Sequence, residues 1–102
     1  MNNATQKVRL WCMNDEGLYT SIVDFVQENK PVLQEPEHSA ARSAKIILIN
    51  DTAEFMRDLF TAGIRDRDDL LPTIYMDLLN DVNFEEIATE FVDDVLWDVV
   101  WN

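Results

Sequence analysis

Residues 68–102, DDLLPTIYMDLLNDVNFEEIATEFVDDVLWDVVWN, form the stretch of sequence that decides the fold. Ten Asp or Glu residues and no Lys or Arg occur in it, yet Leu, Ile, Phe, Val and Trp recur between them at helical spacing. A disordered acidic tail lacks such regularly placed apolar residues. The pattern therefore predicts packed helices with one apolar side and one densely negative side.

Capping residues divide this stretch into two helices. Asp68 or Asp69 suits the N-cap of the first helix, with Pro72 in its first turn. Asn83 suits the N-cap of the second, and Glu86 three residues later completes a capping-box pattern. The apolar side of the second helix is predicted to comprise Phe84, Ile87, Ala88, Phe91, Val92, Val95, Leu96 and Val99.

The preceding two thirds of the chain also favour helices, because two Gly and three Pro are few for an all-β protein. Helices are expected over residues 16–29 and from about residue 36 to 62. Residues 5–13 fit a short strand or a short helix, and we favour the helix; residues 46–49 are also strand-like. The buried face of the long helix is expected to include Ala40, Ala44, Ile47, Leu48, Phe55, Met56 and Leu59.

These elements predict an all-α fold, a compact array of four to five helices in one acidic domain spanning residues 1–102. The formal net charge is −12. Residues 68–102 contribute −10 and residues 1–67 only −2. Such a charge argues against direct binding to nucleic acid or to an anionic membrane, and it favours a basic protein surface as partner.

The cellular compartment is also indicated by the sequence. The lone Cys12 excludes an intramolecular disulfide and favours a reducing compartment. Residues 1–11 lack the long apolar run of a secretion signal, and no stretch approaches the length of a transmembrane helix. We therefore expect a cytoplasmic protein.

A row of carboxylates is the main candidate for a binding site. Glu86, Glu90, Asp94 and Asp98 recur every four residues, which on a helix places them on one side in steps of about 6 Å. The repulsion costs on the order of 1 kcal/mol, and no base in the stretch offsets it. Such a row resembles the phosphates of a nucleic-acid strand. The alternative is a solvated acidic face. Asp93, which flanks the row, and the pair Asp77 and Asp81 on the preceding helix would support the contact.

Two tryptophans near the end of the chain allow two interpretations. Trp97 and Trp101 are four residues apart, with Val100 beside them. Packing onto the core beside Trp11 is the favoured interpretation. The alternative is an apolar interface with a partner or with a second copy of the chain, because Trp is enriched at interface hot spots.

Motifs for catalysis or for cofactor binding are absent from the sequence. A calcium loop beginning at Asp66 would place Leu71 where the EF-hand needs glycine, so it is a poor match. Cys12 has no second cysteine to pair with and is expected to be a core thiol. We therefore predict no enzymatic activity, no cofactor and no metal site.

Three segments together resemble a family of small uncharacterised proteins found in phages and in bacterial and archaeal genomes. They are residues 8–19 (VRLWCMNDEGLY), the middle helix over residues 40–60, and residues 75–88 (YMDLLNDVNFEEIA). The sequence departs from the family before Val8, where Ala4, Thr5, Gln6 and Lys7 replace a Tyr-Glu-Thr-Trp-like opening. The resemblance implies an all-helical fold and a phage or mobile-element origin, hence the host cytoplasm, and it implies no activity.

Two hypotheses for function follow. The first is a non-catalytic phage or mobile-element inhibitor of a host defence system, of restriction or CRISPR type. It would act as an acidic DNA mimic by binding a basic nucleic-acid groove. The alternative is a structural or regulatory interaction module that self-associates, for example as a homodimer, through Trp97 and Trp101.

Overall fold

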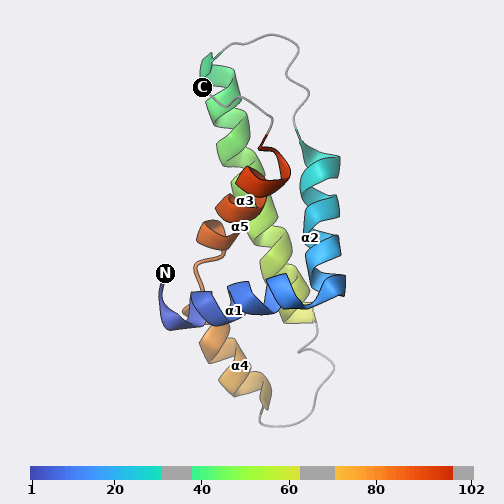
Figure 1. Cartoon of the computed structure of the whole chain (residues 1–102). Helices are drawn as coiled ribbons and strands as arrows, with labels where there is room; N and C mark the ends of the chain where they lie inside the picture. The colour runs from blue at the N-terminus through green and yellow to red at the C-terminus, as the bar shows by residue number, and fades with distance from the viewer. Residues whose placement is uncertain (31–37, 63–70, 98–102) are drawn as a thin grey trace.

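A computed structural model describes residues 1–30, 38–62 and 71–97 (Figure 1). Those residues form five α-helices: α1 (Asn3–Asn14), α2 (Glu16–Asn29), α3 (His38–Ala62), α4 (Leu71–Asn80) and α5 (Phe84–Val95). The all-α prediction is confirmed. Residues 5–13 lie within α1 and residues 46–49 within α3, so the strand alternatives are wrong, and no strand occurs within the described ranges.

The long helix α3 is the axis on which the other helices are arranged. Helix α2 runs beside α3, α5 packs against α3 in the most extensive helix pair, and α1 crosses near one end of both (Figure 1). Helix α1 also contacts α5. The first and last described helices, far apart in sequence, are therefore neighbours in space.

Side-chain caps begin three of the helices. The side chains of Asn2, Asp15 and Asn83 accept hydrogen bonds from the first turns of α1, α2 and α5. Asp15 also ends α1, because its N–H donates to the carbonyl of Trp11 at 3.0 Å. A single residue therefore separates α1 from α2, and free backbone groups of both helices are satisfied there.

The buried side chains form two adjoining clusters, both of which contact the partly buried Ile49. Helix α3 contributes a row spaced four residues apart, namely Leu48, Thr52, Met56 and Phe60. Ile47, which we expected on this buried face, is instead 59% exposed because it lies about 100° around the helix from that row. The larger cluster comprises Val8, Cys12, Ile22, Ala53, Met56, Phe60, Leu79, Val82, Phe84, Ile87, Ala88 and Phe91.

Several predicted features lie outside the part of the chain that the structure describes. They include the N-cap at Asp68 or Asp69 and the side chains of Ala40, Pro72 and Val99. Within the described helices, none is long and apolar enough to cross a lipid bilayer.

Candidate acidic interface

Helix α5 carries Glu86, Glu90 and Asp94 of the predicted row, and the flanking Asp93. Its apolar side is buried as predicted at Phe84, Ile87, Ala88, Phe91 and Val92, so the acidic side faces solvent. The side chains of Glu86, Glu90 and Asp93 retain 42%, 37% and 51% exposure. Glu85 and Glu86 lie in the first turn, where the helix dipole favours negative charge.

Three of these carboxylates form ion pairs with cations from other parts of the chain. The amino group of Met1 lies 3.7 Å from Glu86, Arg9 of α1 pairs with Glu90, and Lys45 Nζ of α3 lies 2.7 Å from Asp93. The stretch itself holds no base to offset the repulsion along the row, but folding brings cations from the N-terminus, α1 and α3 to α5. Surface ion pairs contribute about 0–1 kcal/mol each, the same order as the repulsion.

Two hydrogen bonds join the beginning of α1 to the turn that precedes α5. The side-chain amide of Asn2 donates to the carbonyl of Asp81 at 2.7 Å, and the hydroxyl of Thr5 accepts from the N–H of Asn83 at 2.9 Å. The predicted capping box is therefore half formed. The Asn83 side chain accepts from the N–H of Glu86 at 3.2 Å. The reciprocal bond, from the Asn83 N–H to the Glu86 side chain, is replaced by the bond from the Asn83 N–H to the Thr5 hydroxyl.

Two fully buried threonines allow a matched test of the hydrogen bond between the Asn83 N–H and the Thr5 hydroxyl. Thr5 and Thr52 are both inaccessible, but the Thr52 hydroxyl has no hydrogen-bond partner among the described residues. We expect Thr5→Val to lower the free energy of unfolding by about 1–3 kcal/mol, because it leaves the Asn83 N–H unpaired. Thr52→Val should leave stability unchanged or raise it by about 1 kcal/mol. Urea denaturation measures both, and equal losses would contradict the proposed difference.

The remaining predicted carboxylates are exposed. Asp77 and Asp81 of the α4 end and Asp94 of α5 are exposed and form no ion pair with another described residue. Asp98 and Trp101 lie outside the described residues. Asp77, Asp81 and Asp94 are thus accessible charges that no described residue compensates by an ion pair.

Trp97 is exposed rather than packed. Its side chain is 82% accessible, so the prediction that it docks beside Trp11 is wrong. Trp97 lies beyond the end of α5 at Val95, and the adjacent Leu96 is buried in its place. Trp11 instead makes an edge-to-face contact with Phe60, with ring centroids 5.3 Å apart.

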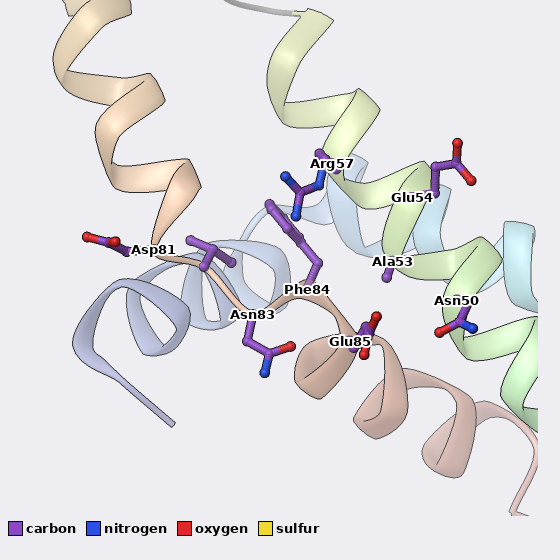
Figure 2. A pocket seen from close by; sticks show the side chains of 9 residues that line it. Asn50, Ala53, Glu54, Arg57, Asp81, Asn83, Phe84 and Glu85 are labelled. Atoms are coloured by element: carbon purple, nitrogen blue, oxygen red, sulfur yellow. The ribbon is translucent and has the colours of Figure 1, made fainter.

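A groove between α3 and the start of α5 was not predicted from the sequence. It consists of two neighbouring hollows of about 480 and 350 Å³ that share Asn50, Asn83 and Glu85. Figure 2 shows the first hollow, with the Arg57 guanidinium extended over the Phe84 ring, 5.2 Å from its centroid. The second hollow is lined additionally by Ile46, Ile49, Glu86 and Thr89.

Cys12 is a core thiol, as predicted. It is fully buried, and desolvation raises the pKa of the thiol from 9.0 to about 12. Groups of three or more His, Cys, Asp or Glu side chains able to hold a metal ion are absent from the described part of the chain.

The raised pKa predicts an unreactive thiol in the folded protein. A shift from 9.0 to about 12 lowers the thiolate population at pH 8 by roughly 1,000-fold, and the thiolate is the reactive form. Between pH 9 and 12 the thiol of Cys12 stays protonated in the folded state but ionises in the unfolded state. The free energy of unfolding therefore falls as the pH rises through this range. We expect alkylation by iodoacetamide at pH 8 to be at least about 100-fold slower than in urea. Comparable rates would show that Cys12 is accessible.

Comparisons with protein-family models, with curated proteins and with solved structures give no match for this chain. The resemblance to the family of small phage and prokaryotic proteins therefore stays a prediction.

Proposed function

We propose that this protein is a non-catalytic inhibitor that presents the acidic sides of α4 and α5 to a basic nucleic-acid groove, as a mimic of DNA. The partner would be a host defence complex of restriction or CRISPR type, met in the host cytoplasm. That setting, and the phage or mobile-element origin, rest on the family resemblance. The acidic docking itself rests on the charges of the folded chain.

The supporting observation is the set of accessible carboxylates from Asp77 to Asp94. Asp77, Asp81 and Asp94 are exposed without an ion pair among the described residues. The paired Glu86, Glu90 and Asp93 keep more than a third of their side-chain surface accessible. Since each carboxylate has about four acceptor sites, a partner's Arg or Lys can bind beside the chain's own cation.

A DNA-displacement assay tests the proposal. Purified restriction endonucleases and guide-loaded CRISPR effectors are bound to labelled duplex DNA, and the protein is added at about 50 mM and about 300 mM salt. We expect displacement of DNA from at least one complex at low salt and much weaker displacement at high salt, because complementary charges drive the association. Absence of displacement at low salt from both types of complex, or displacement insensitive to salt, would overturn the proposal.

Self-association is a second candidate, favoured by the 82% exposure of Trp97. A tryptophan this exposed is a suitable anchor for an interface. If the chain forms a dimer, Trp97→Ala should shift it to monomer in size-exclusion chromatography with light scattering. Leu10→Ala is the control, because Leu10 is also an exposed apolar residue, 48% accessible, but lies on α1. A wild-type protein that stays monomeric at high concentration would exclude this function.

A further inference from the structure

The groove between α3 and α5 combines a negative rim with apolar walls. Figure 2 shows Asn50 and Glu85 on the two sides of the gap between α3 and α5, while the carboxylates of Glu54 and Asp81, which also line the first hollow, point away from that gap. Ile46 and Ile49 line the neighbouring hollow, and Ile46 is 53% exposed. The two hollows together are lined by four carboxylates, from Glu54, Asp81, Glu85 and Glu86, and by one Arg.

The groove already accommodates one guanidinium group at its Phe84 end. Arg57 lies over the Phe84 ring at 5.2 Å, a cation–π contact. Where the two hollows meet, Glu85 forms no ion pair with a described residue. The volumes of about 480 and 350 Å³ lie within the range of small-ligand sites, about 300–1,000 Å³.

We propose that this groove binds an arginine side chain presented by the partner protein, an inference that rests on the proposed function and names the group recognised. The guanidinium lies between the Glu85 carboxylate and the Asn50 amide oxygen. Its aliphatic stem covers Ile46 and Ile49. Arginine fits better than lysine, because its planar fork donates to two acceptors at once.

A titration of ¹⁵N-labelled protein with the blocked peptide acetyl-Gly-Arg-Gly-Arg-Gly-amide tests the site. We expect amide shifts concentrated at residues 46–50 and 83–89. Glu85→Gln and Asn50→Ala should each weaken binding about threefold to tenfold. The control is Asp24→Asn, which removes the same charge from an exposed position on α2, and it should weaken binding less than twofold, since an exposed charge acts weakly at a distance. The citrulline peptide, which has the same shape without charge, should bind at least about tenfold more weakly.

A second pair of variants distinguishes the effect of a charge inside the groove from the effect of net charge on peptide binding. Arg57→Gln removes the cation inside the groove and should strengthen peptide binding, whereas Lys7→Gln removes an exposed cation from α1 and should not. The inference is overturned if Asp24→Asn weakens binding as much as Glu85→Gln, or if Lys7→Gln strengthens it as much as Arg57→Gln.

The inference and the proposed function fail in distinguishable ways. If Glu85→Gln lowers peptide affinity while the wild-type protein displaces DNA from no defence complex, the arginine site is supported and the proposed function is wrong. If wild-type protein displaces DNA and the peptide shows no preference for the groove, the function stands and the arginine site is wrong.

Discussion

Phe91→Ala is expected to lower the free energy of unfolding by about 3–5 kcal/mol. Phe91 lies in the middle of α5, is 2% exposed, and has its ring centroid 5.8 Å from that of Tyr19. Its removal leaves a cavity within the larger core cluster, where α5 packs against the rest of the fold. A domain of this size has a stability of about 5–15 kcal/mol, so the loss is a large fraction of the total. Urea denaturation followed by far-ultraviolet circular dichroism measures it.

Trp97→Ala provides the matched control for Phe91→Ala. It removes a larger aromatic side chain six residues further along, but one that is 82% exposed. We expect a change within about 0.5 kcal/mol in the monomer. A loss of several kcal/mol from Trp97→Ala would mean that this side chain is buried in solution, in the core or against a second copy, and light scattering separates the two cases.

The second large expected effect is a loss of DNA displacement by the protein. The double variant Asp77→Lys, Asp94→Lys should lower DNA displacement at least about 100-fold, which corresponds to about 2.7 kcal/mol. Each reversal replaces an attraction to the basic groove with a repulsion. Because both side chains are exposed and form no ion pair with a described residue, helicity and thermal stability should stay close to wild type. Displacement assays and circular dichroism check the two parts of this expectation.

A second double variant tests whether the position of the carboxylates matters, rather than the net charge alone. Asp24→Lys, Glu28→Lys reverses two exposed carboxylates on α2 and changes the net charge equally. It should retain most of the displacing activity. Equal losses from both double variants would show that only net charge matters and that no particular face mimics DNA. Glu90→Lys is less informative, because it also breaks the pair with Arg9.

The helices and their caps could be predicted because they depend on neighbours in sequence. Asn83, the predicted N-cap of α5, accepts from the N–H of Glu86 three residues later. The spacing of Phe84, Ile87, Ala88, Phe91 and Val92 predicted which side of α5 is buried. The burial of α3 was predicted less well, because apolar residues occur nearly all around it. Packing, rather than spacing, selects Thr52 and leaves Ile47 exposed.

The surroundings of the acidic row could not be predicted, since they depend on residues far away in sequence. Arg9 and Glu90 are 81 residues apart, and their pairing requires α1 to lie beside α5. The groove could not be predicted for a similar reason. Asn50 and Glu85 carry no motif, and they share a site only because α3 and α5 cross there.

The hydrogen bonds from Asn2 and Thr5 to the turn at Asp81–Asn83 also bear on the order of folding. They close loops of 79 and 78 residues. The chain entropy of closing such long loops is lost before the contacts stabilise the fold, so contacts of this kind slow folding. We therefore expect the α1–α5 contact to form late. The start of α5, with Glu85 and Glu86, would then be held in place only after α1 has met the turn at Asp81–Asn83.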